Sequence, residues 1–293
     1  MQFSDEAILE ELLNYPEFSL KHEDKFRIAF LADPQYANLE DDLEERCYFR
    51  ATPKKMTKVM HFLNQQSLDL VVTLGDIVDR AWQDYPAVLK PYEDLCHPHL
   101  FVLGNHDAKA MFSQFQVDLN YHVPIRYHSW SLGHFRFIMI DGNDRSLYAY
   151  HSNAQEYLDA KLQLSHLAQE KKQYAKSWNG ALSPSQFEWL EEQLIEAQQA
   201  QQQVVVVGHY ALAPNLNAHN LWNCEEITGL LHKYGAKVSL NGHNHCGAQY
   251  VLGETLFYTV PGIVADPYIA PLIILEISKV GELSIERHYL IKK

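Results

Sequence analysis

Short apolar runs that each end in a polar or glycine-containing turn recur along this chain. Runs of this length, bounded by turn residues, are typical of buried strands. Segments with helical periodicity lie between them, and residues 185–199, which follow Pro184, form one such predicted helix. The alternation predicts an α/β fold built of layers. The apolar runs cover residues 26–32, 70–74, 100–103, 135–140, 204–207 and 238–240.

The length and composition predict one domain. A chain of 293 residues with 47% hydrophobic residues can fill a substantial core, so we expect a single domain over residues 1–293. From about residue 144 to 182 the pattern changes to a Gln- and Lys-containing stretch with aromatic and leucine side chains at helical intervals, which predicts a helical insertion. Its aromatic residues are expected to pack, with capping of a substrate as the alternative.

The charge balance is acidic, with a formal net charge of −13 and a sequence pI near 5.6. No stretch gathers enough Lys and Arg to attract a polyanion, so neither nucleic acid nor an anionic membrane is an expected partner. A small phosphorylated substrate still fits this balance if metal ions make one pocket locally positive.

The cysteines and the N-terminal residues point to a reducing compartment. Cys47, Cys96, Cys224 and Cys246 are scattered without a C-x-x-C pair, which indicates free thiols. The first residues lack a basic region followed by an apolar run, and no window approaches the ~18 apolar residues of a membrane span. We therefore expect a cytoplasmic protein.

Polar residues that are suited to metal binding follow the first two apolar runs. Asp33 and Gln35 are two apart, so both side chains would lie on the same side of an extended segment, although Asp-Pro is also a common turn opening. Asp76 follows Gly75, which permits a sharp exit from the strand, and a carboxylate there can bridge two cations. A strand-to-helix turn with Asp76 as its cap is the alternative.

Histidines follow three further runs. Asn105 and His106 place a neutral oxygen ligand beside an imidazole, although a capped turn with a surface histidine would look the same. His209 ends the run at 204–207. His243 and His245 are two apart, so both rings can project to one side and bind adjacent metals. The other 12 of the 16 histidines are interpreted as ordinary.

The order of these five segments resembles that of the calcineurin-like metallophosphoesterases, whose motifs are D-x-H, G-D-x-x-D, G-N-H-[DE], a lone histidine and G-H-x-H. The resemblance spans residues 33–245. It implies a four-layer α-β-β-α sandwich of two mixed sheets flanked by helices, with two metal ions bridged by Asp76.

The resemblance also implies a role for each matching residue. One metal would take Asp33, Asp76, His245 and Gln35. The other would take Asp76, Asn105, His209 and His243. His106 would remain unligated and act on the leaving group or a phosphoryl oxygen, oriented by Asp79.

Gln35 stands where the broad family has histidine. An amide oxygen is a harder ligand than imidazole, so we expect Mn²⁺, with Mg²⁺, Fe or Zn²⁺ as alternatives. Residues 33–41, followed by Arg46, Tyr48 and Arg50, look like the manganese-dependent ADP-ribose/CDP-alcohol diphosphatases. Residues 141–144 look like that group's second acidic turn, whereas residues 262–267 fit it less well.

The implied substrate is a small nucleotide-type molecule, cleaved at a phosphoanhydride bond to release a nucleoside monophosphate. Arg46, Arg50 and Arg80 are candidates for its second phosphate, since guanidinium groups match phosphate oxygens. Tyr36 or Tyr210 would stack on its base, with core packing as the alternative for both.

Three other functions compete with this prediction. The same metal core would serve a cyclic-nucleotide or other small-molecule phosphodiesterase. A phosphoprotein phosphatase is disfavoured because Ala81 replaces the usual glycine after Arg80. A non-catalytic scaffold is disfavoured because the ligand set and His106 are retained.

Overall fold

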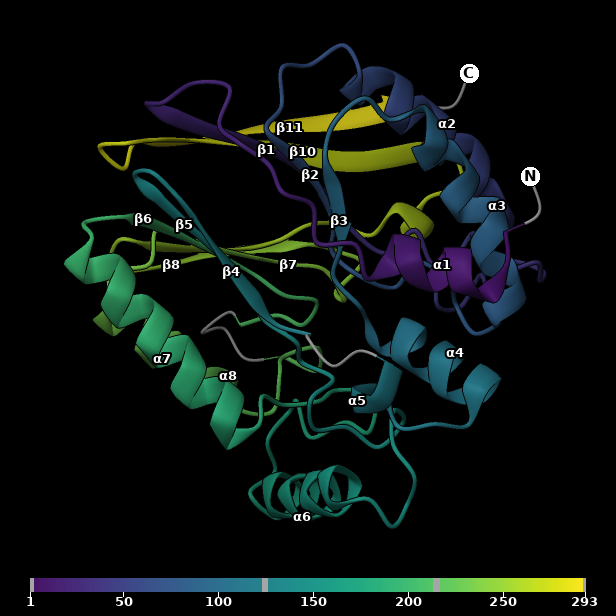
Figure 1. Cartoon of the computed structure of the whole chain (residues 1–293). Helices are drawn as coiled ribbons and strands as arrows, with labels where there is room; N and C mark the ends of the chain where they lie inside the picture. Colours follow the sequence, from purple (N-terminus) through teal and green to yellow (C-terminus); the bar gives the residue numbers. More distant parts are fainter. Residues whose placement is uncertain (1–2, 123–125, 213–216, 292–293) are drawn as a thin grey trace.

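Two mixed β-sheets pack face to face in the computed structural model, which describes residues 3–122, 126–212 and 217–291 (Figure 1). One sheet consists of β1 (Lys25–Leu31), β2 (Leu70–Thr73), β3 (His99–Phe101), β10 (Ile269–Ser278) and β11 (Leu283–Ile291), in the order β11-β10-β1-β2-β3. The other consists of β4 (His128–Leu132), β5 (Phe135–Met139), β6 (Gln203–Val207), β7 (Val238–Asn241), β8 (Ala248–Leu252) and β9 (Thr255–Thr259), in the order β4-β5-β6-β7-β9-β8.

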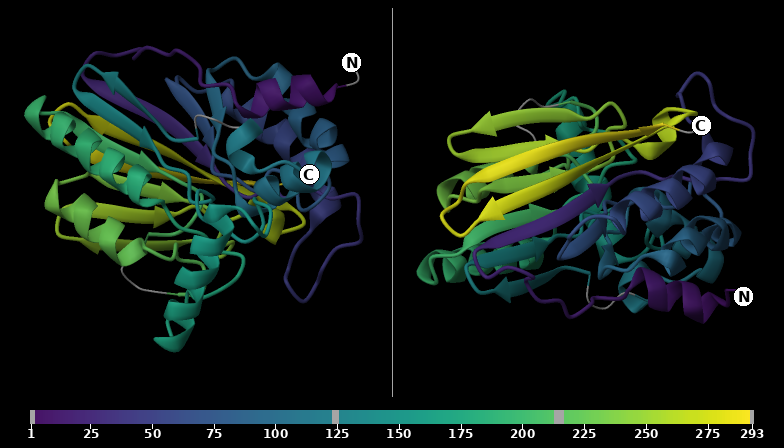
Figure 2. Two further views of the ribbon diagram at one scale, coloured as in Figure 1. Left: turned by 60° about the horizontal axis from the view of Figure 1, so that its bottom comes forward. Right: turned by 90° about the horizontal axis from the view of Figure 1, so that it is seen from above.

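Helices cover the outer faces of both sheets. The α-helices are α1 (Asp5–Leu12), α2 (Thr52–Leu63), α3 (Tyr85–Leu89), α4 (Asn105–Phe115), α5 (Leu119–His122), α6 (Gln155–Gln169), α7 (Pro184–Gln199) and α8 (Cys224–Lys233). Short 3₁₀ turns are η1 (Phe49–Ala51), η2 (Trp82–Asp84), η3 (Lys90–Asp94) and η4 (Ile263–Ala265). In Figure 2, α2 lies against the first sheet, and α7 and α8 lie outside the second. The predicted four-layer sandwich is confirmed.

The central strand β1 explains why the molecule is layered. Its residues alternate between two cores, because successive side chains of a strand point to opposite faces. Ile28 and Phe30 pack between the sheets, where they join Phe137 of β5. Ala29 and Leu31 pack on the outer face against the helices. All five side chains are fully buried, so a polar residue at any of them would disrupt one layer.

Parallel strands bring the predicted motif segments to one edge of the sandwich. β1, β2 and β3 are parallel to one another, as are β5, β6, β7 and β9. The loops that follow the carboxyl ends of parallel strands therefore meet. The two sheets are joined there by the His209 ring, which hydrogen-bonds to the carbonyl of Leu74 at 2.7 Å. The six strands predicted from the sequence and the helix at 185–199 are confirmed to within about a residue or two at each end.

The predicted insertion at 144–182 contains one α-helix, α6, in which Ala160 is the buried residue. Figures 1 and 2 show α6 projecting from the rest of the molecule. The remainder of the stretch is irregular, and Tyr150 and Tyr174 are buried in two separate hydrophobic cores of the molecule, in keeping with the packing expected of its aromatic residues. Trp178 is different, because 43% of it is exposed.

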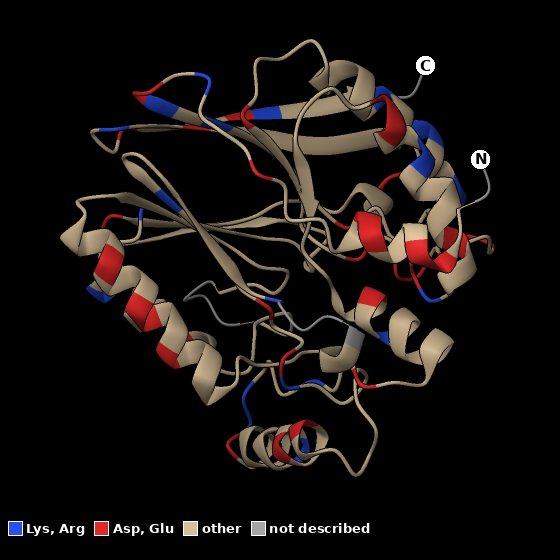
Figure 3. Ribbon diagram, in the orientation of Figure 1, with Lys and Arg blue, Asp and Glu red and all other residues tan. Residues whose placement is uncertain are grey.

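Acidic and basic residues are interspersed along the ribbon in Figure 3. None of the described helices has both the length and the apolar character that crossing a bilayer requires.

A buried ion-pair network holds the loop after β5. Arg126 approaches Asp141 at 2.9 Å and also pairs with Asp144, and its guanidinium donates to the Tyr150 hydroxyl at 2.9 Å. Burial raises the pKa of Asp141 to about 6, an effect that the Arg126 charge opposes. One arginine therefore compensates two buried carboxylates.

Replacing Arg126 with methionine should lower the free energy of unfolding by about 3–5 kcal/mol, because it leaves buried carboxylates without a cation. Urea denaturation of Arg126→Met measures this. Arg145→Met is the matched control, since the Arg145–Asp159 pair is more exposed and such pairs contribute about 0–1 kcal/mol. Equal effects of the two substitutions would contradict a special role for Arg126.

Candidate metal centre

The loops after β1 and β2 have a strained backbone at the predicted ligands. Asp33, Gln35 and Asp76 have φ values of 48°, 40° and 51°, in the left-handed region that non-glycine residues rarely adopt. The Asp33 N–H donates to the Gly75 carbonyl at 3.2 Å, and the Gln35 N–H donates to the Asp76 carbonyl at 2.7 Å. The predicted extended segment at 33–35 is therefore wrong, because pairing with the neighbouring loop bends it.

The loop after β3 reaches Asp76 because Gly104 has no side chain. A Cβ atom on Gly104 would lie 2.1 Å from Asp76 Oδ1. The same oxygen accepts a hydrogen bond from the His106 N–H at 3.0 Å. Asp107 then fastens the two loops, since its fully buried carboxylate accepts from the N–H groups of Ile77 at 3.0 Å and Gly104 at 2.9 Å.

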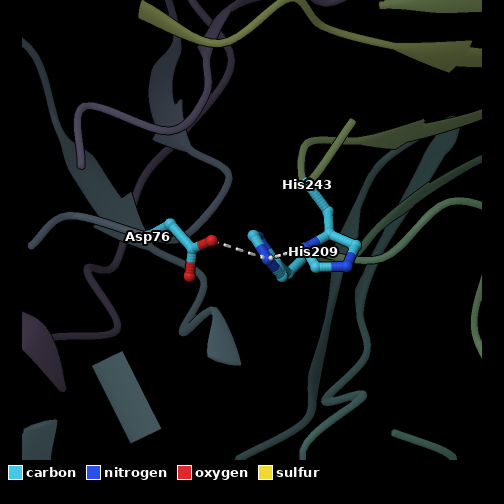
Figure 4. Close-up of side chains that lie close together, drawn as sticks. All are labelled: Asp76, His209 and His243. Carbon is cyan, nitrogen blue, oxygen red and sulfur yellow. Dashed lines mark hydrogen bonds and ion pairs between the residues drawn. The ribbon is translucent and has the colours of Figure 1, made fainter. Parts of the chain in front are cut away.

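Three buried ligand-type side chains converge at this point. The ligand atoms of Asp76, His209 and His243 all lie within 4.8 Å of one another, as Figure 4 illustrates. His209 Nε2 is 3.3 Å from Asp76 Oδ2 and 3.1 Å from His243 Nδ1. Asn105 Oδ1 is also 3.1 Å from His209 Nε2. Two nitrogens and two oxygens thus point at one small volume, which suits a divalent cation.

The hydrogen bond to Leu74 sets the tautomer of His209. A carbonyl only accepts, so Nδ1 carries the proton that His209 donates to Leu74. In the neutral ring, Nε2 then holds the lone pair and faces the cluster. This is the usual arrangement of a histidine that binds a metal.

Asp33 and His245 lie beside this cluster. Both oxygens of the fully buried Asp33 carboxylate accept from the His243 N–H, at 3.0 and 3.1 Å. Within the described residues, no Lys or Arg forms an ion pair with Asp33 or Asp76. His245 is partly buried and packs on Gly262, where a Cβ atom would lie 2.9 Å from its Cδ2.

Gln35 offers its amide oxygen. Gln35 Nε2 donates to Asp79 Oδ1 at 3.0 Å, which fixes the orientation of the amide. Gln35 Oε1 is buried and has no hydrogen-bond partner among the described residues. A buried carbonyl oxygen without a partner is costly, so the residues present fit a cation at this position.

Burial and neighbouring charges determine the protonation of the cluster. Burial raises the pKa of Asp33 well above its usual range, and the Asp76 charge adds to this. Burial would also raise the pKa of Asp76, but the charges of His209 and His106 lower it below its usual value. Burial would lower the pKa of His209, but the Asp76 charge and hydrogen bond raise it to about 9.

The other two histidines are held neutral. Burial and the His209 charge lower the pKa of His243 well below its usual value. Burial likewise lowers the pKa of His245, to about 4, against the opposing effect of Asp76. Both rings are therefore deprotonated near neutral pH, which is the form that binds a cation.

His106 and Asp79 lie together at the edge of the cluster. His106 Nδ1 hydrogen-bonds to the Asp79 carbonyl and lies 3.5 Å from Asp79 Oδ1. The Asp79 carboxylate is almost fully buried and also contacts Arg80. These contacts leave His106 Nε2 available to a substrate.

A cavity of about 540 Å³ opens beside the cluster. Arg80, one of the candidates for a phosphate contact, lines it. Arg46 and Arg50 do not line it; Arg50 is exposed and pairs with Glu40 at 2.6 Å. The cavity is lined by Gln35, Asp42, Glu45, Cys47, Phe49, Asp76, Asp79, Arg80, Asn105, His106, Trp178, His219, His243, Asn244, His245 and Cys246.

The two predicted base-stacking tyrosines do not line the cavity. Tyr36 is partly buried elsewhere in its loop. Tyr210 is almost fully buried, and its ring centroid lies 4.9 Å from that of His209 and 4.8 Å from that of His243. Tyr210 therefore packs against the two histidines, and packing was the alternative to base stacking for this residue.

Sequence reasoning missed several residues around the site. Asp107 matches the last position of the G-N-H-[DE] motif, and the sequence alone indicates no role for it. Asn143 accepts from the Tyr210 hydroxyl at 2.8 Å and donates to the Leu103 carbonyl at 2.9 Å, so the acidic turn supports the site from behind. Trp178 and His219 line the cavity, and no local pattern distinguishes them from packing residues.

The family follows from comparison with known proteins. A family model described as calcineurin-like phosphoesterase matches residues 26–247. The chain therefore belongs to the calcineurin-like phosphoesterase family, and it is a metal-dependent phosphohydrolase.

Curated relatives share a single name. The chain is 26% identical to the manganese-dependent ADP-ribose/CDP-alcohol diphosphatase of Arabidopsis thaliana over 77% of this chain and 82% of the relative. It is 25% identical to the human protein of that name over 76% of this chain and 78% of the relative. Among solved structures, a dimetal phosphatase from Danio rerio has the same fold, with a TM-score of 0.77 and 19% identity, covering 92% of this chain and 99% of the other.

Replacing Asp76 with asparagine should weaken Mn²⁺ binding by more than the roughly 10–100-fold typical for loss of a residue that only supports a ligand. The substitution keeps the shape but removes the central charge of the cluster. Equilibrium dialysis with elemental analysis measures binding. Asp107→Asn is the matched control, because Asp107 is buried and, among the described residues, its carboxylate accepts hydrogen bonds from loop N–H groups and a tyrosine hydroxyl. If Asp76→Asn bound Mn²⁺ as tightly as Asp107→Asn, Asp76 would not be a ligand.

Proposed function

We propose that this protein hydrolyses the phosphoanhydride bond of nucleoside diphosphate-linked small molecules, of the ADP-ribose or CDP-alcohol type, and releases a nucleoside monophosphate. The observation that carries this proposal is the position of Trp178 in the same cavity as Arg80 and His106. The cavity thus offers an aromatic surface for a base as well as groups for phosphates. The shared name of the curated relatives supports the same substrate class.

We propose two divalent cations, most simply Mn²⁺, as the cofactors. When bound, they would lower the pKa of a shared water and neutralise charge on the phosphoryl group. The proposed ligands of one are Asp33, Gln35, Asp76 and His245. Those of the other are Asp76, Asn105, His209 and His243.

His106 is proposed as the acid. Its Nδ1 hydrogen-bonds to the Asp79 carbonyl and lies 3.5 Å from Asp79 Oδ1, and these contacts orient the ring. The free Nε2–H then donates to the leaving oxygen or to a phosphoryl oxygen. Arg80, which is largely exposed at the cavity, is the proposed contact for the second phosphate.

The substrate's base is proposed to stack on Trp178. The indole is substantially exposed although it is large and apolar, and the Lys176 ammonium lies over the ring at 5.7 Å from its centroid. Every base has a flat π-face, so such stacking tolerates both adenine and cytosine. Glu45 lines the same cavity and is able to accept hydrogen bonds from sugar hydroxyls.

The substrate class is tested by comparing ADP-ribose, CDP-choline and cyclic AMP as substrates in the presence of Mn²⁺. We expect AMP from ADP-ribose or CMP from CDP-choline, with cyclic AMP left intact. Hydrolysis of cyclic AMP alone would instead favour the phosphodiesterase alternative and overturn the proposal.

Replacing His106 with alanine should lower kcat by about 10²–10⁴-fold, the usual contribution of a positioned acid. The bound Mn²⁺ should stay the same, because the side chain is not a proposed ligand. Elemental analysis and steady-state kinetics measure the two quantities. His151→Ala, at a histidine that pairs with Asp118 outside the cavity, is the control. Unchanged turnover in His106→Ala would remove His106 from the mechanism.

Replacing Trp178 with alanine should raise KM for ADP-ribose by about 5- to 150-fold, because base–aromatic stacking contributes about 1–3 kcal/mol. kcat should change much less, and Trp178→Phe should restore most of the affinity. A KM that is unaffected in Trp178→Ala would show that the base binds elsewhere.

A further inference from the structure

Asn179 is a fully buried amide whose orientation is set by its neighbours. It lies after α6 in the irregular part of the 144–182 stretch. Asn179 Nδ2 donates to the carbonyl of Tyr174 at 3.0 Å and to that of Ala218 at 2.7 Å. Both partners only accept hydrogen bonds, so the nitrogen of the amide has to be on their side.

The amide oxygen therefore faces His243. Asn179 Oδ1 lies 2.9 Å from His243 Nε2. An amide oxygen only accepts, so His243 carries its proton on Nε2 and donates it to Asn179. In the neutral ring, His243 Nδ1 then holds the lone pair. That nitrogen is the one that lies 3.1 Å from His209 Nε2, inside the cluster with Asp76.

Close packing and hydrogen bonds fix the backbone around Asn179. A Cβ atom on Gly180 would lie 2.1 Å from the Gly142 carbonyl oxygen, so the chain here packs directly on the turn after β5. The Trp222 N–H donates to the Gly180 carbonyl at 2.8 Å, and the Asn179 N–H donates to the Lys176 carbonyl at 3.1 Å. The backbone of Asn179 and of the residue that follows it is thus fixed by its neighbours.

We propose that Asn179 is a positioning residue for the metal centre, which selects the Nε2-protonated tautomer of His243 and holds its ring so that Nδ1 binds a cation. Histidines that bind metals usually donate their other ring N–H to a carboxylate, a carbonyl or water, and loss of that partner costs about 10–100-fold in metal affinity. The inference rests on the proposed function, since it needs His243 to be a ligand.

Asn179 is next in the sequence to the proposed base-binding residue. The neighbouring Trp178 lines the cavity, whereas Asn179 holds the histidine. One short segment therefore contributes to both the proposed base-binding surface and the proposed metal centre. Its helical periodicity gives no indication of the contact to the proposed metal centre.

The test measures Mn²⁺ binding to the whole protein by calorimetry, with electron paramagnetic resonance to detect spin-coupled pairs of Mn²⁺. Wild-type protein is expected to bind two ions. Asn179→Ala should bind one of them about 10–100-fold more weakly and lose the coupled signal at limiting Mn²⁺. Asn179→Asp should bind this ion more tightly than Asn179→Ala, because its carboxylate still accepts the Nε2–H, although it loses the donated hydrogen bonds to Tyr174 and Ala218.

Asn223→Ala is the matched control. Asn223 hydrogen-bonds to the backbone of Leu182 at 3.0 and 3.2 Å and so stabilises the same segment, but it makes none of the contacts to the metal cluster described above. It should bind two ions as the wild type does. Thermal melting of the metal-free variants checks that each one folds.

The outcomes separate the two proposals. Wild-type protein that binds no Mn²⁺ would contradict the proposed function itself. Two ions bound with unchanged affinity in Asn179→Ala would overturn the role of Asn179 while the proposed function stands. Binding in Asn179→Asp no tighter than in Asn179→Ala, or equal weakening in Asn223→Ala, would also overturn it, because the acceptor would then not be the cause.

Discussion

Two fully buried carboxylates, those of Asp33 and Asp76, meet where the two sheets end, and the described part of the chain gives neither of them a Lys or Arg partner. Burying a charge without compensation is costly, and two like charges side by side increase the cost. The His209 imidazole supplies part of the compensating positive charge, because its pKa rises to about 9 beside Asp76. The remaining need for positive charge is what a cation at this site would satisfy. The loops, glycines and supporting hydrogen bonds around the site all serve to hold this pair in place.

The backbone that carries the proposed ligands is strained. Asp33, Gln35, Asp76 and His243 all have left-handed backbones, at a cost on the order of 1–3 kcal/mol each. Such conformations persist only where their surroundings over-determine them. Here, Asp107 fastens the loops after β2 and β3, and the turn after β5 supports Tyr210 behind the histidines through Asn143. These supporting residues surround the proposed ligands, and no single motif contains them all.

The sequence predicts the layered fold and six of its strands because each of the six is a short apolar run that ends in a turn, but β9 and the largely buried β10 are not among the predicted runs. It predicts the metal-site residues because their types follow those runs in a set order. It does not predict the bend at Asp33 and Gln35, which arises from hydrogen bonds to a loop about 40 residues away. Asn179 is missed for a similar reason, and Trp178 is expected to pack, with capping of a substrate only as the alternative, since helical spacing of aromatic residues looks the same whether the side chains pack or line a cavity. The placement of Tyr210 depends on Asn143 and Tyr148, which tertiary folding alone brings to it.

We propose that the strand ends hold a pair of metal ions that share Asp76 as a ligand. Crystals grown with Mn²⁺ and measured at the manganese absorption edge test it most directly. We predict two anomalous peaks, about 3.5–4 Å apart, one beside Gln35 Oε1 and the other beside His243 Nδ1. A single peak, or manganese that does not contact Asp76, would contradict it.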